Sequence, residues 1–362
     1  MKAFVTGGTG FIGRRLVRQL LARGDEVRVL ARSPQSASDL AAAGAHIVPG
    51  DITDLESMTA DMRGSDVVFH VAAWYKIGTA DTSQARKINV DGTRNVLGLA
   101  YALGVPRIVY TSTVAVFGDT SGETVDEDYR ADPGALLTEY DRTKWAAHYE
   151  VALPLIEQGA PIVIVLPGGV FGPGDTSIVG DLMRRFYGGR LPVLPGPETA
   201  ITYAHVDDIV AGHLLAAEKG RVGESYILAG PGLTMGEFAD LFALLTGMRA
   251  PRLRIPAGWL RPFAPLMGLL QQLVPVPDTF GGESLAMLGA TYLARSDKAR
   301  QELGWQPRPV EEGLADTLAW LADATPPGRG LSRRNKRLAA VGLAVAAGLV
   351  AVWLLSRRKG DR

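Results

Sequence analysis

The glycine-rich stretch at the amino terminus constrains the fold of this chain more than any other feature. Residues 6–13 read TGGTGFIG, follow a short β-rich run and lead into a helical pattern. The spacing G-x-G-x-x-G makes the tight turn between a strand and a helix, and it lets the backbone approach a pyrophosphate. We therefore predict a dinucleotide site here, with contacts from Gly7, Thr9, Gly10, Phe11, Ile12 and Gly13.

β-rich apolar runs alternate with helical patterns through the first 230 residues, which predicts an α/β fold with a doubly wound parallel sheet (Rossmann). Residues 1–230 are expected to form this NAD(P)-binding domain, with an excursion at about 172–204 into a smaller domain. After Gly230 several prolines break the chain into short pieces, so 231–328 are expected to be a substrate-binding lid. The candidate strands are Lys2–Thr6, Val27–Ala31, His46–Val48, Val67–Ala73, Arg107–Ser112, Ile162–Leu166 and Ser225–Leu228.

The C-terminal tail differs from the rest of the chain in charge and hydropathy. The chain of 362 residues has no net charge, yet residues 329–362 hold nine Lys or Arg and one acid. Residues 338–355 are uncharged and lie between a basic linker, 329–337, and a basic tail, 356–362. This pattern predicts a single C-terminal transmembrane anchor, with a buried or amphipathic helix as the alternative.

The remaining composition excludes several classes of protein. Residues 1–328 are acidic overall, which argues against nucleic-acid binding. The amino terminus lacks the long apolar run of a signal peptide, so we expect the body of the chain to lie in the cytoplasm, held at a membrane by the anchor. There is no Cys, and the histidines lack the spacing of metal ligands, so no disulfide or metal site is predicted.

The choice between NADP and NAD is made at the end of the second strand. An NAD enzyme places an Asp or Glu there to hold the ribose 2′-hydroxyl. This chain has Arg32, whose guanidinium can bind a 2′-phosphate, while Asp25 and Glu26 lie at the opposite end of the strand. The sequence favours NADP, with NAD possible if Arg32 stacks on adenine or is only solvated.

A second motif carries acid–base chemistry. Tyr140 and Lys144 are four residues apart on a predicted helix and share one face. A neighbouring ammonium favours the phenolate and so lowers the pKa of a tyrosine toward the range useful for catalysis. Residues 111–113, Thr-Ser-Thr, end the fifth strand at the sheet edge where ligands bind, and a hydroxyl there can hold a substrate oxygen. Alone, the Tyr-Lys pair is also typical of a surface helix; with the other two motifs it predicts catalysis.

In order along residues 1–322, these motifs resemble the extended short-chain dehydrogenase/reductase family. Besides those above, the matching segments are Gly50–Ile52, His70–Ala73, Asn89–Thr93, Thr111–Gly118, Pro167–Gly172 and His205–Asp208. The resemblance implies further cofactor contacts: at adenine, along the cofactor, at the nicotinamide ribose and at the carboxamide. In chain order these are Asp51, Ile52, Ala72, Ala73, Lys144, Pro167 and Val170.

The resemblance also implies the catalytic set. By register, Thr113 takes the role of the family's serine beside Tyr140, and Asn89 would help a proton relay from behind the site. For Asn89 a helix N-cap is a compatible structural role. Candidate substrate contacts are Trp74 and Tyr75, for which a loop role is the alternative, and Ser112.

Two departures from the family narrow the reaction. Val114–Ala115 replace the Asp-Glu pair of nucleotide-sugar dehydratases, which argues against dehydration. Ile201–Thr202 replace the Arg-Asp pair that grips a diphosphate in many sugar-nucleotide enzymes, although Arg184, Arg185 or Arg190 could compensate.

The remaining similarity is to dihydroflavonol reductases, 3β-hydroxysteroid dehydrogenases and hopanoid-associated epimerase-like proteins. It implies an NADP-dependent oxidoreductase that acts on a carbonyl or hydroxyl of a largely apolar small molecule, and the family suggests a homodimer. A nucleotide-sugar epimerase with retained NAD and a non-catalytic NADP-sensing membrane module are the alternatives.

Overall fold

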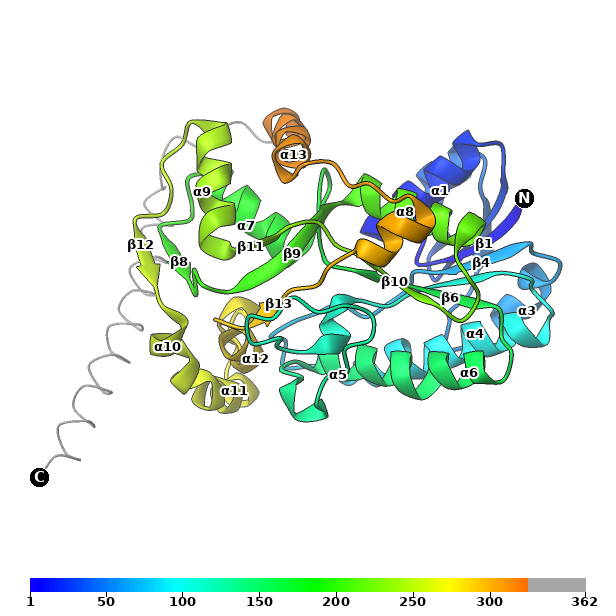
Figure 1. Ribbon diagram of the computed structural model, residues 1–362, viewed down its shortest axis with the longest axis horizontal. Helices are drawn as coiled ribbons and strands as arrows, with labels where there is room; N and C mark the ends of the chain where they lie inside the picture. Colours follow the sequence, from blue (N-terminus) through cyan, green and yellow to red (C-terminus); the bar gives the residue numbers. More distant parts are fainter. Residues whose placement is uncertain (325–362) are drawn as a thin grey trace, which may run out of the picture.

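The computed structural model describes residues 1–324, and a seven-stranded parallel sheet forms its centre (Figure 1). The strand order is β10-β6-β5-β4-β1-β2-β3. The order of the strands along the chain reverses between β1 and β4, which opens a crevice at their carboxyl ends. The strands are β1 (Lys2–Thr6), β2 (Glu26–Ala31), β3 (His46–Pro49), β4 (Val67–His70), β5 (Ile108–Thr111), β6 (Ile162–Pro167) and β10 (Ser225–Leu228).

Helices cover both faces of this sheet, so its strands are apolar on both sides (Figure 1). On β1, for example, Phe4 packs toward one face and Val5 toward the other. One face holds α1 (Phe11–Ala22), α2 (Ser38–Ala42) and α8 (Val206–Lys219). The other holds α3 (Glu56–Met62), α4 (Thr93–Ala102), α5 (Glu139–Ala146) and α6 (Leu153–Glu157). The prediction of a doubly wound α/β sheet is confirmed.

Short irregular helices adjoin several of these elements. Wider π-type turns occupy Lys87–Gly92, Ala147–Ala152 and Ala299–Leu303. Tighter 3₁₀ turns occupy Pro34–Ala37, Val114–Phe117, Pro133–Ala135, Arg261–Phe263 and Asp278–Phe280. The first π turn precedes α4 and contains Asn89, and the second follows α5, the helix that carries Tyr140 and Lys144.

The smaller domain is built from shorter pieces around its own aromatic core, which includes Phe171, Tyr203, Phe238 and Phe242. One sheet has the order β11-β9-β13, with β7 also paired to β9, and a second sheet joins β12 to β8. The strands are β7 (Gly169–Phe171), β8 (Val193–Pro195), β9 (Ala200–His205), β11 (Gly232–Thr234), β12 (Leu253–Ile255) and β13 (Thr291–Tyr292). The helices are α7 (Ile178–Tyr187), α9 (Met235–Thr246), α10 (Ala257–Leu260), α11 (Ala264–Leu273), α12 (Gly282–Ala286) and α13 (Val310–Ala324).

The sequence predicts a C-terminal transmembrane helix, and the structure does not support this prediction. No helix within residues 1–324 is long and apolar enough to cross a bilayer. The apolar stretch on which the expectation rested, 338–355, lies outside the described residues, as do the basic segments at 329–337 and 356–362. We therefore withdraw the single-pass anchor and the membrane location inferred from it.

Candidate active site

The glycine-rich loop is shaped by contacts that leave no room for side chains. Gly7 has a positive φ of 72°, and a Cβ on it would lie 2.5 Å from the backbone nitrogen of Ala72. A Cβ on Gly13 would lie 2.1 Å from the carbonyl oxygen of Gly7. Helix α1 therefore begins directly against the loop, with the N-cap Gly10, which has no side chain to cover the first turn. The free N–H groups of that turn, with Thr9, Phe11 and Ile12 around them, fit a pyrophosphate.

The end of β2 presents an unpaired cation to this site. Arg32 is exposed and has no ion pair or side-chain hydrogen bond within residues 1–324. The nearby Arg14 is already engaged, because it pairs with Asp39 and donates to the carbonyl oxygen of Ser36 at 2.9 Å. Asp25 is bound to the terminal ammonium of Met1 at the other end of the strand. Among the described residues, Arg32 is thus a guanidinium without a partner at the end of β2, where the sequence predicts a contact with the cofactor.

The residues predicted near adenine form a turn after β3. Asp51 accepts hydrogen bonds from the backbone N–H and the hydroxyl of Thr53, at 2.8 and 2.9 Å. Ile52 is buried against Gly92, where a Cβ would come within 2.6 Å of its side chain. One oxygen of the Asp51 carboxylate, Oδ1, therefore stabilises its own turn.

Helix α5 places Tyr140 and Lys144 on one face, and its first turn is firmly capped. The hydroxyl of Thr138 accepts from the N–H of Asp141, and the Asp141 carboxylate accepts from the N–H of Thr138. Asp141 also accepts from the Tyr292 hydroxyl at 3.0 Å, which ties the helix start to the smaller domain. The acidic residue inside the YDRTK motif thus has a structural role.

Tyr140 lies between a hydroxyl and an aromatic ring. Its ring meets the Tyr75 ring edge-on, with the centroids 4.9 Å apart. Burial raises the pKa of the Tyr140 phenol, and a hydrogen bond with Thr113 acts in the opposite direction. Thr113 also caps the turn after β5 by accepting from the N–H of Ala115 at 3.1 Å. The structure therefore places Thr113, Tyr140 and Tyr75 together.

Lys144 is buried beneath this group, and its Nζ donates to the carbonyl oxygen of Thr111 at 2.8 Å and to the Tyr110 hydroxyl at 3.3 Å. Burial lowers its pKa to about 7. The sequence predicts that the ammonium lowers the pKa of Tyr140. In the structure, desolvation dominates instead and keeps the Tyr140 phenol protonated.

Asn89 holds the loop that follows β4. Its side chain accepts from the backbone N–H of Trp74 at 2.7 Å and donates to the Trp74 carbonyl oxygen and the Thr143 hydroxyl, both at 3.0 Å. It lies within the π turn Lys87–Gly92 and does not cap a helix. Trp74 is itself buried, so this loop presents Tyr75, and Ala73 beside it, to the site.

The hydroxyl groups at the end of β5 point in different directions. Ser112, predicted to contact substrate, turns its hydroxyl to Nδ1 of the buried His148 at 2.9 Å. Thr111 turns to Nε2 of His213, also at 2.9 Å. Thr113 is therefore the hydroxyl of this segment that lies with Tyr140. Sequence reasoning missed His148 and Tyr110 as neighbours of the catalytic residues. Alternation along β5 predicts only that Tyr110 and Thr111 lie on opposite sides of the sheet.

The backbone predicted to meet the carboxamide leaves the sheet directly after β6. Gly168 donates its N–H to the carbonyl oxygen of Leu228 at 3.1 Å, which fixes the chain between Pro167 and β7. Val170 packs against the core on the α1 side of the sheet. In β9, Ile201 and Thr202 stand beside this segment, through the pairing of β7 with β9 and the contact of Thr202 with Gly168.

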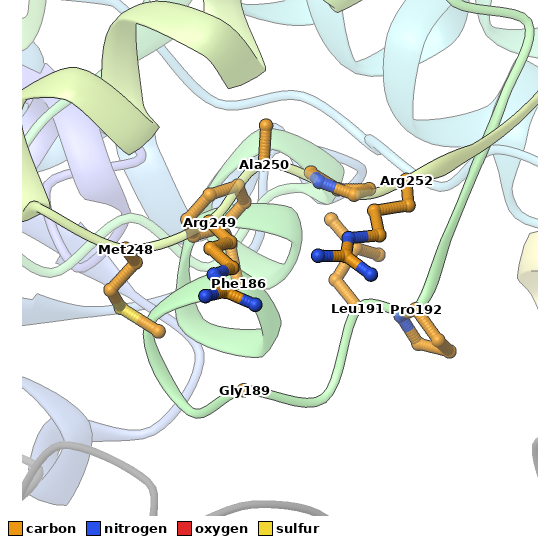
Figure 2. Close-up of a pocket in the computed structure, with 9 residues that line it drawn as sticks. Phe186, Gly189, Leu191, Pro192, Met248, Arg249, Ala250 and Arg252 are labelled. Carbon is orange, nitrogen blue, oxygen red and sulfur yellow. The ribbon is translucent and has the colours of Figure 1, made fainter.

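Two other features lie apart from these residues. The hollow in Figure 2 has a volume of about 300 Å³ and is lined by the α7–β8 turn and the α9–β12 loop, with Arg249 and Arg252 directed into it. No residue predicted for catalysis or cofactor binding lines it. His205, Asp207 and Asp316 lie close enough together to hold a metal ion, but Arg15 already pairs with Asp207 at 2.9 Å. Neither feature changes the assignment of the site.

The fold and the site define an NAD(P)-binding Rossmann protein with the side chains of a hydride-transfer enzyme. Residues 3–229 match the NAD dependent epimerase/dehydratase family. The chain belongs to this family and is an oxidoreductase of the extended short-chain dehydrogenase/reductase type, which confirms the resemblance inferred from the sequence.

Two relatives and one solved structure illustrate the similarity. Sterol demethylase protein B of Methylococcus capsulatus is 32% identical over 328 residues, covering 89% of this chain and 99% of the relative. The 4-hydroxy-2-methyl-3-oxo-4-farnesyl-3,4-dihydroquinoline-1-oxide ketoreductase of Stigmatella aurantiaca is 32% identical over 333 residues, covering 91% and 98%. The dTDP-glucose 4,6-dehydratase DesIV of Streptomyces venezuelae, with NAD and TYD bound, has a TM-score of 0.73 at 26% identity, covering 89% and 97%.

Proposed function

We propose that this enzyme transfers hydride between NADP and a carbonyl or hydroxyl carbon of a largely apolar substrate. The observation that carries the proposal is the cluster of Thr113, Tyr140 and buried Lys144 at the carboxyl edge of the sheet. The glycine-rich loop fits the cofactor, because its close backbone packing leaves an open helix terminus for the phosphates.

The protein's own residues supply the proton chemistry. When bound, the nicotinamide supplies or accepts the hydride. Tyr140 is a neutral phenol in the structure, so in the reducing direction it can donate its proton to the substrate oxygen. Thr113 orients that oxygen, and Lys144 holds the nicotinamide ribose and stabilises the phenolate that remains. In the oxidising direction the same groups act in reverse order.

An apolar substrate is favoured by what surrounds Tyr140. The neighbouring ring of Tyr75 offers an apolar face, and β9 presents Ile201 and Thr202 where a cation for a diphosphate would be expected. The names of the two relatives refer to a sterol and to a farnesylated quinoline oxide. A hydroxyl or carbonyl on a largely apolar molecule is therefore the proposed reacting group.

The alternative function is that of an epimerase that retains NAD and returns the hydride to the same molecule. It is supported by the description of the family and by the NAD in the DesIV structure. A non-catalytic NADP sensor would not need Thr113, Tyr140 and Lys144 together. We keep the homodimer as a prediction, which sedimentation of the full chain tests.

Cofactor identity separates the two functions. The full-length protein is denatured, the released nucleotide is identified, and binding of added NADPH and NADH to undenatured protein is measured by fluorescence. We expect little retained nucleotide, tighter binding of NADPH, and a loss of that preference by about tenfold or more in Arg32→Ala. Arg63→Ala removes an exposed arginine outside the site and serves as the control. Retained, near-stoichiometric NAD would contradict the proposal and support the epimerase.

A further inference from the structure

Tyr110 lies directly beneath the catalytic lysine. It is fully buried on β5, its hydroxyl accepts from Lys144 Nζ at 3.3 Å, and Nζ is 4.8 Å from the centre of its ring. One side chain thus offers the ammonium both a hydrogen-bond acceptor and the negative face of an aromatic ring. Such contacts fix a cation in direction as well as in distance.

The ammonium of Lys144 has few other partners. Within residues 1–324 no carboxylate forms an ion pair with it, and its second acceptor is the backbone carbonyl of Thr111 at 2.8 Å. An ammonium has three N–H groups, so with two of them held from below, one is left for the cofactor. Tyr110 supplies the single side-chain acceptor in this arrangement among the described residues.

The titratable groups around Lys144 carry no compensating charge. His70 on β4 and His148 after α5 are both buried, and burial lowers the pKa of each to about 3, so both are neutral at physiological pH. Burial raises the pKa of the Tyr140 phenol on the same helix and of the Tyr110 phenol on β5, so both stay protonated. The ammonium therefore depends on dipoles and on a ring face, since no carboxylate of residues 1–324 pairs with it.

Tyr110 is itself held in place by a buried chain of polar groups. Its ring stacks on that of His70, with centroids 5.6 Å apart. His70 bonds to the Thr93 hydroxyl at 3.0 Å and to the Thr6 hydroxyl at 2.7 Å, and Thr93 also hydrogen-bonds to the Tyr110 phenol. Thr6 is the last residue of β1 before the glycine-rich loop. The orientation of the phenol is thus fixed from β1, β4 and α4 together.

We propose that Tyr110 is a positioning residue for Lys144, which aims the ammonium at the cofactor ribose and stabilises its protonated form. This inference rests on one part of the proposed function, the contact of Lys144 with the cofactor. It predicts that loss of the Tyr110 hydroxyl weakens cofactor binding in a way that depends on pH. A residue that served only the packing of the core would weaken binding equally at all pH values.

The molecule contains a matched control for this arrangement. Lys298 Nζ lies 5.2 Å from the centre of the Tyr226 ring, and Tyr226 is also buried, with its hydroxyl bound to Glu302 at 2.7 Å. Lys298 differs in that it is partly exposed and pairs with Glu224 at 2.6 Å. Tyr226→Phe therefore removes a buried hydroxyl beside a lysine without touching the catalytic group.

The test compares Tyr110→Phe with Tyr226→Phe in the full-length chain. The dissociation constant of NADP⁺ is measured by quenching of tryptophan fluorescence from pH 5.5 to 9, with NAD⁺ used instead if it binds more tightly. Loss of one hydrogen bond to a charged group lowers the pKa of the lysine by about one unit. We expect the dissociation constant of Tyr110→Phe divided by that of Tyr226→Phe to rise about tenfold between pH 5.5 and pH 8.

A ratio that stays constant across this range overturns the proposal. The proposal also fails if the affinity of the wild type shows no pH dependence that is lost in Lys144→Met. If neither cofactor binds the wild-type protein, it is the proposed function that fails, so the two failures are distinguishable. Thr93→Val removes a hydrogen-bond partner of the Tyr110 phenol and leaves the phenol in place. It should shift the pH dependence in the same direction by a smaller amount, even if Tyr110→Phe does not fold.

Discussion

The sheet domain and the smaller domain of this enzyme are built in contrasting ways. In the sheet domain, parallel strands are buried on both faces, and the glycine loop packs so closely that added Cβ atoms would meet backbone. In the smaller domain the strands are two to six residues long, and α10 and α11 leave Trp259, Leu269 and Leu273 more than half exposed.

The difference teaches where chemistry and selectivity are encoded. Tyr140, Lys144, Thr113 and the glycine loop all belong to the closely packed sheet domain, so changes there should affect every substrate. The smaller domain reaches the site through ties such as Tyr292 to Asp141 and Gln271 to Gly78. Changes in it should alter which substrate is bound and leave cofactor affinity unchanged.

The largest effect is expected for Tyr140→Phe. Without the phenol, no group is placed to give a proton to the substrate oxygen, so kcat should fall by about 10³. NADPH binding and the melting temperature should stay close to wild type. Tyr101→Phe, which removes a hydroxyl at the surface that bonds to Gln158, should turn over normally. Normal turnover by Tyr140→Phe would remove Tyr140 from the mechanism.

The next largest effect is expected for Gly13→Ala. Its Cβ would meet the Gly7 carbonyl, so the loop must shift and cofactor affinity should fall by at least about tenfold, as seen by fluorescence titration. Gly98→Ala is the control, because Gly98 lies in α4 with open space around its position. That change should raise the free energy of unfolding by about 0.5–1 kcal/mol and leave binding unchanged. Equal affinities in the two variants would contradict the close packing of loop and helix.

Lys144→Met should change how the stability of the protein depends on pH. Burial lowers the pKa of Lys144 from 10.5 to about 7, so between these values the unfolded chain binds more protons at this residue than the folded chain. The free energy of unfolding of the wild type therefore gains from this residue as pH rises from about 7 to about 10. The variant lacks this pH-dependent contribution, so it should melt at a higher temperature than wild type at pH 6. The difference between the two melting temperatures should narrow toward pH 10. An unchanged gap would mean that Lys144 does not titrate in this interval.

The smallest effect is expected for Gln271→Ala. Gln271 on α11 accepts from the N–H of Gly282 at 3.2 Å and donates to the carbonyl oxygen of Gly78, which lies in the loop that carries Tyr75. Releasing this loop should raise KM for the substrate by about threefold to tenfold, with NADPH affinity unchanged. A loss of NADPH affinity in this variant would break the proposed division between the two domains.

Much of the sheet domain was predictable from the sequence because the signals are local. The candidate strands Lys2–Thr6 and Ser225–Leu228 coincide with β1 and β10, and the glycine spacing implies the tight turn before α1. Side-chain direction was harder to predict. Tyr110 on β5 and Ser112 directly after it lie on the opposite side of the sheet from the Thr111 side chain. Only the packing of the helices decides which of the two sides faces Lys144.

The smaller domain was less predictable for a physical reason. Residues 255–276 are mostly apolar in sequence and fall within the expected lid, 231–328. In the structure this segment forms the short helix α10, a 3₁₀ turn and the ten-residue helix α11, and most of its large side chains stay at the surface. Burial in such a segment depends on tertiary contacts that composition does not specify.

Transfer of deuterium is the most direct test of net hydride transfer to an apolar carbonyl. The full-length enzyme is incubated with NADPH deuterated at the transferring C4 position and a panel of steroid and prenylated ketones, and the products are analysed by mass spectrometry. We expect an alcohol with one deuterium on the new carbinol carbon, formed by wild type and not by Tyr140→Phe. Protein that retains NAD and transfers no deuterium to any member of the panel, yet inverts a hydroxyl of a nucleotide sugar, would contradict this function.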